Sequence, residues 1–208
     1  MNKTKSKICD AAIRLFGEKG YSNVSLREIA EAAGTTIGNL TYHYAQKDLL
    51  LEAIAMRYQD EFMVSFDTIS SDLLELAVSS FFKAQKNEEL APVYYQNIYE
   101  FINISPALRE RNEKFRKSLY DFYMAILSGL KEQGVLRQDL AAREITVLSY
   151  SIVFLESLWV QNASPYYDEE LPKVPLAEAL CSLLKQNLAA TQVARFEELC
   201  EIQKAANC

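Results

Sequence analysis

Apolar side chains recur every three or four residues along most of the chain, and no segment alternates between apolar and polar residues as a half-buried strand would. In the N-terminal quarter such stripes predict four helices, which begin near Ile8, Leu26, Ile37 and Leu50. Further helices are predicted over about residues 71–86, 90–104, 107–132, 141–163 and 175–205. The pattern therefore predicts an all-α fold.

Cap and turn residues mark the ends of the first helices. Ser25 and Glu28 have the spacing of a capping box, in which the hydroxyl accepts from the backbone of residue 28 while the carboxylate reaches back. The other signals are Gly20 and Gly34 as left-handed helix ends, Thr35 or Thr36 as the cap of a third helix, and Asp48 as the cap of a fourth. Two short helices over residues 25–44, joined at Gly34, predict a helix-turn-helix.

The second helix of such a motif must present polar side chains of modest size to the major groove of DNA. Residues of that kind gather here: Thr35, Thr36, Gly38, Asn39 and Thr41. Gly38 lowers helix propensity by about 1 kcal/mol. Because a glycine destabilises so short a helix, its presence indicates that this face of the helix lies close to another molecule.

The charge is unevenly distributed over the 208 residues. The whole chain carries a net charge of −6, but residues 1–50 carry +2 and the remainder −8. This balance excludes a uniformly basic nucleic-acid coat, and an apolar share of half excludes a disordered chain. A small basic head on an acidic body is expected when only the head meets phosphate.

Membrane insertion and secretion are not expected. Charged or amide residues interrupt every apolar stretch well before the length of a membrane span, and the N-terminus lacks the features of a signal peptide. A cytoplasmic location is therefore predicted. The four cysteines, Cys9, Cys181, Cys200 and Cys208, are expected to be reduced thiols, and nothing in the sequence supports a redox pairing of Cys200 with Cys208.

Catalytic and metal-binding constellations are missing from the sequence. His43 is the single histidine, and the widely spread cysteines cannot form a zinc site of ordinary spacing. No nucleophile–base set or pair of carboxylates stands out. We therefore expect no enzymatic activity, no metal and no cofactor.

The first fifty residues resemble the TetR family of bacterial regulators. The motifs that carry this resemblance are Ile8-x-x-Ala11-Ala12-x-x-Leu15-Phe16-x-x-x-Gly20, Ser25-x-x-x-Ile29-Ala30-x-x-Ala33-Gly34 and Gly38-x-Leu40-x-Tyr42-His43-Tyr44-x-x-Lys47-Asp48-x-Leu50. The resemblance implies a DNA-binding domain over residues 1–47 and a helical effector-binding and dimerisation domain over residues 48–208. It also implies a homodimer that binds a palindromic operator on double-stranded DNA, represses transcription, and is released by a small molecule.

Within this motif, Lys47 looks like a phosphate contact, and the resemblance implies that the Ser25 hydroxyl can both cap its helix and meet a phosphate. One position departs from the family, which usually has tyrosine where this chain has Thr41. Tyr42 is expected to face the duplex, and Tyr44 to pack inward. The complete predicted DNA-binding set is Ser25, Arg27, Thr35, Thr36, Gly38, Asn39, Thr41, Tyr42, His43 and Lys47.

The helical body is predicted to hold an aromatic pocket for a mostly apolar ligand, and a dimer interface. The predicted pocket residues are Phe62, Phe66, Tyr95, Tyr99, Tyr123 and Phe154. The predicted interface residues are Val147, Tyr150, Ser151, Phe154, Leu158, Leu180, Leu184 and Leu188. Two alternatives stay open here: a DNA-binding helical dimer without a small-molecule effector, controlled by a protein partner or acting architecturally, and a helical enzyme or carrier that merely resembles the motif.

Overall fold

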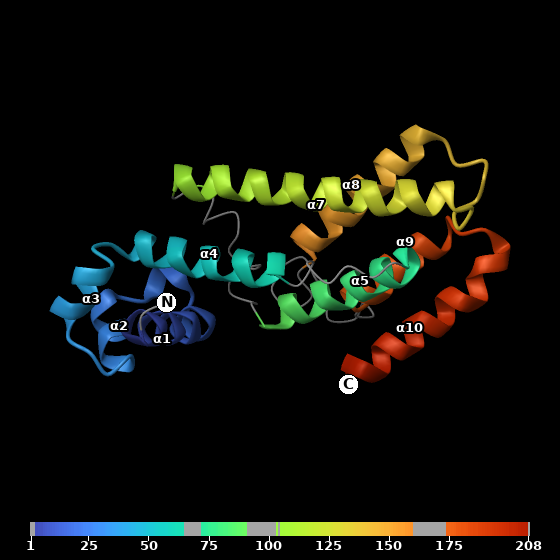
Figure 1. The fold of residues 1–208 in the computed structure, drawn as a ribbon. Helices are drawn as coiled ribbons and strands as arrows, with labels where there is room; N and C mark the ends of the chain where they lie inside the picture. Colours follow the sequence, from blue (N-terminus) through green and yellow to red (C-terminus); the bar gives the residue numbers. More distant parts are fainter. Residues whose placement is uncertain (1–2, 65–71, 91–102, 104, 160–173, 208) are drawn as a thin grey trace. The chain divides into compact units, whose positions relative to one another are not determined.

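The chain is all-helical in the computed structural model, which describes residues 3–64, 72–90, 103, 105–159 and 174–207 (Figure 1). Its elements are α1 (Lys3–Lys19), η1 (Tyr21–Asn23), α2 (Leu26–Ala32), α3 (Ile37–His43), α4 (Lys47–Val64), α5 (Leu73–Leu90), α7 (Pro106–Glu132), α8 (Ala142–Leu158), α9 (Leu176–Lys185), η2 (Ala190–Gln192) and α10 (Val193–Asn207). Within these residues, extended pairing is limited to one isolated bridge between Leu136 and Leu188. The predicted all-α fold is confirmed.

The predicted single helix over residues 175–205 is wrong, because the chain forms two helices there. α9 ends at Lys185, and the next residues turn away to pair with the loop after α7. In that pairing Arg137 N donates to Asn187 O at 3.0 Å, and Ala189 N donates to Val135 O at 2.9 Å. These long-range bonds satisfy backbone groups that a continuous helix would otherwise use. The predicted helix over 90–104, and the end of the one over 141–163, lie largely outside the described residues.

The chain divides into two compact units, one formed by residues 1–61 and 91–112 and the other by residues 62–90 and 113–208. In the first unit, α1 to α4 and the start of α7 enclose one apolar core. Its fully buried members include Ile8, Ile29, Leu40, Leu50 and Leu108. α2 and α3 lie together beside α1, at the beginning of α4 (Figure 1). The predicted domain boundary after residue 47 stays a prediction.

In the second unit, α5 packs against α9 and α10, and α8 packs against α9. The core combines aliphatic residues from these helices with Phe81, Tyr123 and Phe196. No helix in the described parts of the chain is long and apolar enough to span a bilayer.

Candidate nucleic-acid interface

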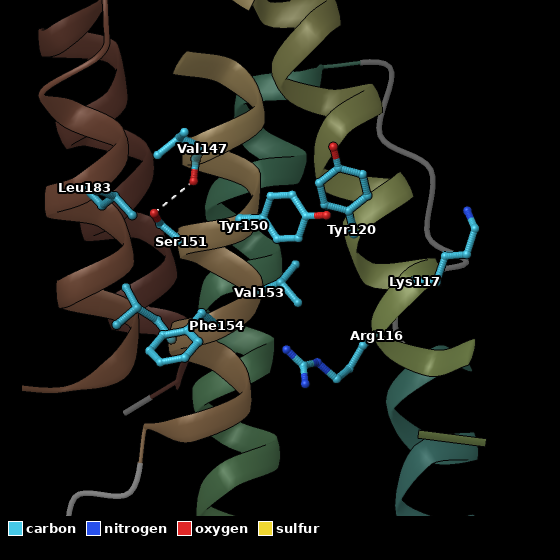
Figure 2. A pocket seen from close by; sticks show the side chains of 10 residues that line it. Arg116, Lys117, Tyr120, Val147, Tyr150, Ser151, Val153, Phe154 and Leu183 are labelled. Carbon is cyan, nitrogen blue, oxygen red and sulfur yellow. Dashed lines mark hydrogen bonds between the residues drawn. The ribbon is translucent and has the colours of Figure 1, made fainter. Parts of the chain in front are cut away.

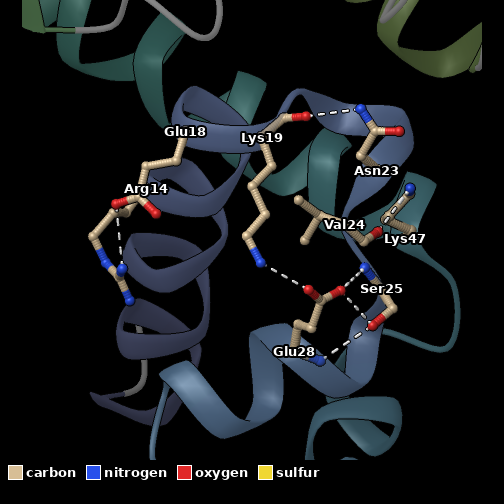
Figure 3. Close-up of polar contacts among 8 residues, drawn as sticks. All are labelled: Arg14, Glu18, Lys19, Asn23, Val24, Ser25, Glu28 and Lys47. Atoms are coloured by element: carbon tan, nitrogen blue, oxygen red, sulfur yellow. Dashed lines mark hydrogen bonds and ion pairs between the residues drawn. The ribbon is translucent and has the colours of Figure 1, made fainter.

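The helix-turn-helix is closed by caps that the sequence predicted. Ser25 Oγ accepts from Glu28 N at 3.3 Å, and Glu28 Oε2 accepts from Ser25 N at 2.9 Å (Figure 3). Gly34 has a φ of +65°, which a residue with a side chain rarely adopts. Of the two threonines proposed as the next cap, Thr36 takes the role: its Oγ1 accepts from Asn39 N at 3.1 Å. The motif is therefore held by local bonds.

α3 turns a polar face to solvent. Leu40 and Tyr44 are buried, whereas Gly38, Asn39 and Tyr42 are exposed, and the Tyr42 side chain is 83% exposed. The expected inward position of Tyr44 is confirmed, whereas the expected contact of the exposed Tyr42 with the duplex stays a prediction.

The side chains along α3 are ordered by bonds among themselves. Asn39 Nδ2 donates to Thr35 Oγ1 at 2.8 Å. Thr41 Oγ1 lies 2.9 Å from Ile37 O and 3.2 Å from Gly38 O, so its one proton is used by the carbonyls of its own helix. The Tyr42 ring meets the His43 ring edge to face, with centroids 5.1 Å apart. Thr41 therefore points its hydroxyl at the helix and exposes little else.

Lys47 joins the start of α4 to the turn that precedes α2. Its Nζ donates to Tyr21 O at 2.8 Å and to Val24 O at 3.0 Å, and lies 4.2 Å from the centroid of the Tyr21 ring. These bonds use two of the three ammonium protons. Asp48 was predicted to cap α4, but this is wrong, because α4 already begins at Lys47; the Asp48 carboxylate instead accepts from the Tyr21 hydroxyl.

The charge of α2 is arranged around Glu28. Lys19 Nζ donates to Glu28 Oε1 at 2.9 Å, and this bond together with those from Ser25 lowers the pKa of Glu28 to about 2 (Figure 3). Glu28 therefore stays anionic and neutralises the charge of Lys19 in an ion pair. Arg27, Lys3 and Lys7 remain exposed basic residues on α2 and at the start of α1.

The same segment matches a known family. Residues 8–54 match the model of "Bacterial regulatory proteins, tetR family". The chain is 25% identical over 181 residues to the probable HTH-type transcriptional regulator YttP of Bacillus subtilis, an alignment that covers 79% of this chain and 86% of YttP. It is 21% identical to the HTH-type transcriptional repressor KstR2 of Mycobacterium tuberculosis, over 90% of this chain and 96% of KstR2.

Residues 8–54 therefore form a DNA-binding domain of the TetR family. The chain is a DNA-binding transcriptional regulator, and the TetR family is not enzymatic. The fold agrees along nearly the whole chain. The crystal structure of a TetR-family regulator from Marinobacter aquaeolei VT8 has a TM-score of 0.80 and 18% identity, and the match covers 97% of this chain and 98% of that one. KstR2, whose structure is described as that of a ketosteroid transcriptional regulator, has a TM-score of 0.65 and 20% identity, over 91% of this chain and 97% of that structure.

The body of this TetR-family regulator contains an open cavity of about 670 Å³ between α7, α8 and α9 (Figure 2). Arg116, Lys117 and Tyr120 reach it from α7, and Tyr150 and Phe154 from α8. The rings of Tyr120 and Tyr150 lie with centroids 4.6 Å apart. The walls are mainly apolar and aromatic, with two cations at one side.

Of the six predicted pocket residues, Phe154 lines this cavity and Tyr123 lies elsewhere, in the core of the second unit. The side chains of Phe62, Phe66, Tyr95 and Tyr99 lie outside the described residues, so their role stays a prediction.

Tyr123 belongs to a buried polar cluster that the sequence analysis missed. Its hydroxyl donates to Glu156 Oε1 and lies 3.2 Å from Ser80 Oγ. Glu156 Oε2 is buried without a hydrogen-bond partner, and burial raises the pKa of this carboxyl to about 8. Glu156 follows Ser149 and Ile152 on the inward face of α8, and this position within an apolar stripe was the available signal.

The predicted dimer residues fall into two groups. Val147, Tyr150 and Phe154 are more than half exposed on α8, and Ser151 beside them is half-buried. Leu180, Leu184 and Leu188 are buried in the core of their own protomer. The side chain of Leu158 lies outside the described residues. The exposed row on α8, formed by Val147, Tyr150 and Phe154, is hereafter called the α8 stripe.

Proposed function

We propose that this TetR-family regulator is a repressor that binds a palindromic operator as a homodimer and leaves it when a small, mostly apolar ligand binds the helical body. The exposed polar face of α3, held by the Thr36 cap within the family's helix-turn-helix, carries the proposal. Repression is supported by the name of KstR2. Action on DNA further implies a cytoplasmic location.

For the DNA contacts, we assign base reading to α3 and phosphate binding to the residues around it. The Asn39 amide suits the edge of a base. Thr35 and Thr36 position Asn39, because their hydroxyls accept hydrogen bonds from its side chain and from its backbone N–H. Ser25, Arg27 and Lys47 suit phosphates, since hydroxyls, cations and helix N-termini commonly bind them. Gly38 lets α3 come close to the duplex. Tyr42 makes the contact with the DNA backbone that the Thr41 side chain is too short to make. His43 supports the Tyr42 ring.

The homodimer proposal is supported by the α8 stripe. The stripe exposes three large side chains in a row on one helix. Burying their apolar surface against a partner would stabilise the assembly by about 25 cal/mol for each Å² removed from water. A second copy of the same stripe is self-complementary, as a two-fold interface requires. Since the stripe also lines the 670 Å³ cavity, the partner would close that cavity.

For the ligand, the support is chemical. Aromatic and aliphatic walls suit a mostly apolar molecule, and Arg116 and Lys117 at one side of the cavity suit one polar group on it. Such a ligand releases DNA only to the extent that it binds the DNA-free conformation more tightly.

The deciding experiment is selection of DNA from a random pool by the purified full chain, followed by salt-dependent binding to the enriched sequence. We expect two inverted half-sites spaced by about 34–36 Å or a multiple of one helical turn, and a steep dependence on salt. A folded protein that enriches no sequence would overturn the proposal.

The ligand part is tested separately, by native mass spectrometry of the purified protein and by DNA release on addition of the molecule found. An operator complex that responds to no retained or added apolar compound would favour a DNA-binding dimer without a small-molecule effector.

A further inference from the structure

Two cysteines that lie far apart in the predicted helical pattern are brought into contact in the second unit. Cys181 lies on α9 and Cys200 on α10, and their sulfur atoms are 3.5 Å apart. Both are free thiols, each less than a tenth exposed. A disulfide needs a separation of about 2.05 Å, so the sulfurs must approach by only about 1.5 Å.

The pair is not sealed in the core, because it lines a groove of about 290 Å³ on the surface of the second unit. The residues around this groove are Phe82, Glu178, Ser182, Lys185, Phe196, Glu197, Glu201 and Lys204. A molecule as small as a hydroperoxide fits such a space, and the two sulfurs form part of its wall.

The two thiols are electrostatically different. The hydrogen bond between the two thiols and the charge of Lys204, one helical turn further along α10, lower the pKa of Cys200. The same hydrogen bond and burial raise the pKa of Cys181. Cys200 is thus the thiol that loses its proton first, and the thiolate is the form that reacts with peroxides.

We propose that Cys181 and Cys200 form an oxidation site at which a hydroperoxide produces an intramolecular disulfide between α9 and α10. The Cys200 thiolate attacks one peroxide oxygen, the O–O bond breaks, and hydroxide leaves, giving a sulfenic acid on Cys200. The Cys181 sulfur then attacks the Cys200 sulfur, and the sulfenic hydroxyl leaves as water after Cys181 gives up its proton. Overall, two thiols and one hydrogen peroxide give one disulfide and two waters.

Cys9 provides an internal control in the first unit. Its sulfur is fully buried, lies 3.5 Å from the Tyr44 hydroxyl, and has its pKa raised chiefly by burial. It lies in the other compact unit from Cys181 and Cys200. The same peroxide treatment should therefore leave Cys9 reduced.

A disulfide here closes a loop between residues 19 positions apart, which spans the end of α9, η2 and the start of α10. Closing that loop restricts the unfolded chain more than the folded one. The oxidised protein should therefore unfold at a temperature several degrees higher than the reduced protein. This consequence is independent of DNA binding and of any effector.

The test treats the purified, reduced full chain with hydrogen peroxide, alkylates the remaining thiols after denaturation, and analyses the peptides by mass spectrometry. We expect two of the four thiols to be lost, a crosslinked Cys181–Cys200 peptide, and recovery of both thiols with dithiothreitol. Cys9→Ser and Cys208→Ser should form the same crosslink, whereas Cys181→Ser and Cys200→Ser should not.

Three results would overturn the proposal: both thiols still alkylated after peroxide, sulfinic acid on Cys200 in place of a crosslink, or a disulfide to Cys208. Each can be observed in the wild-type chain, so the test does not depend on the folding of a variant. Since the readout is the state of the thiols, failure here leaves the proposed repressor function untouched.

Discussion

Glu156 is the residue whose surroundings most strongly alter its chemistry. It is fully enclosed in the second unit, one oxygen accepts from Tyr123, and the other has no partner. An ionised carboxylate in such a place would lack the hydration that stabilises it in water, so the group keeps its proton to a higher pH. Its charge state therefore depends on whether the chain is folded.

From this follows a stability that depends on pH. In the unfolded chain Glu156 ionises near its ordinary pKa of 4.5, whereas in the folded chain it holds the proton up to about pH 8. The protonated Glu156 therefore contributes its full stabilisation to the folded chain below the pKa of 4.5. This stabilisation is lost as the pH rises toward about 8, by at most about 1.4 kcal/mol per pH unit. We expect the free energy of unfolding, measured in urea, to fall across this interval.

Glu156→Gln removes the titrating group, so the decline should flatten. The matched control is Glu113→Gln, an exposed position on α7, which should keep the wild-type profile. An unchanged slope in Glu156→Gln would show that this carboxyl is not the source of the pH dependence.

Lys47 is the residue with the sharpest prediction for DNA. Loss of one phosphate contact should weaken binding of every sequence alike and reduce the salt slope by about one ion. We expect this of Lys47→Ala in binding titrations over a range of salt concentrations, while Lys86→Ala on α5 should behave as wild type. Since Lys47 also bonds the carbonyls of Tyr21 and Val24, thermal unfolding must be measured alongside. Unchanged affinity and slope would refute the phosphate assignment.

Among the elements, α3 depends on two glycines for different reasons. Gly34 has a positive φ in the turn before α3, whereas Gly38 is helical, and an added Cβ would meet no atom within 4 Å at either position. Any effect of alanine on stability must therefore come from the backbone alone. At Gly34 this effect is left-handed strain, and at Gly38 it is a gain in helix propensity.

Opposite outcomes are expected for the two substitutions. Gly34→Ala should destabilise the chain by about 1–2 kcal/mol. Gly38→Ala should stabilise it by about 1 kcal/mol yet weaken DNA binding, because its methyl group would stand between α3 and the duplex. Denaturant unfolding and DNA titration of both variants measure these effects. Undiminished DNA affinity in Gly38→Ala would show that α3 does not approach the bases at this position.

For the molecule as a whole, the α8 stripe is the feature that one protomer leaves unexplained. The described part of the chain buries α9 leucines that could have faced a partner, and leaves Val147, Tyr150 and Phe154 in water. An interface built on this stripe would place two DNA-binding units in one particle, which a palindromic operator requires.

Val147→Glu should therefore convert the proposed homodimer to monomers and lower the affinity for an operator of two half-sites at least tenfold. Val147 is 56% exposed, so the protomer should keep its fold. Light scattering during size-exclusion chromatography gives the oligomeric state, and Ile202→Glu at an exposed apolar position on α10 is the control. A dimer that survives Val147→Glu would place the interface elsewhere.

The all-helical fold, the helix-turn-helix and its caps could be predicted from the amino-acid pattern. These features depend on neighbours three or four residues apart, such as Ser25 with Glu28 and Thr36 with Asn39, and on the 3.6-residue period. Local bonds of this kind form wherever the sequence occurs in a helix, so their positions can be predicted from the sequence alone. The family motif in the first fifty residues has the same local character.

Which polar groups and thiols meet depends on the packing of helices that are distant in the sequence. Glu156 reaches Tyr123 from another helix, Cys181 reaches Cys200 across a break in a predicted helix, and the α9 leucines turn inward while the α8 stripe turns outward. The helical period predicts which face of a helix is apolar, but not which other surface packs against that face. That choice depends on how helices distant in sequence pack together, and burial then sets the chemistry of the side chains between them.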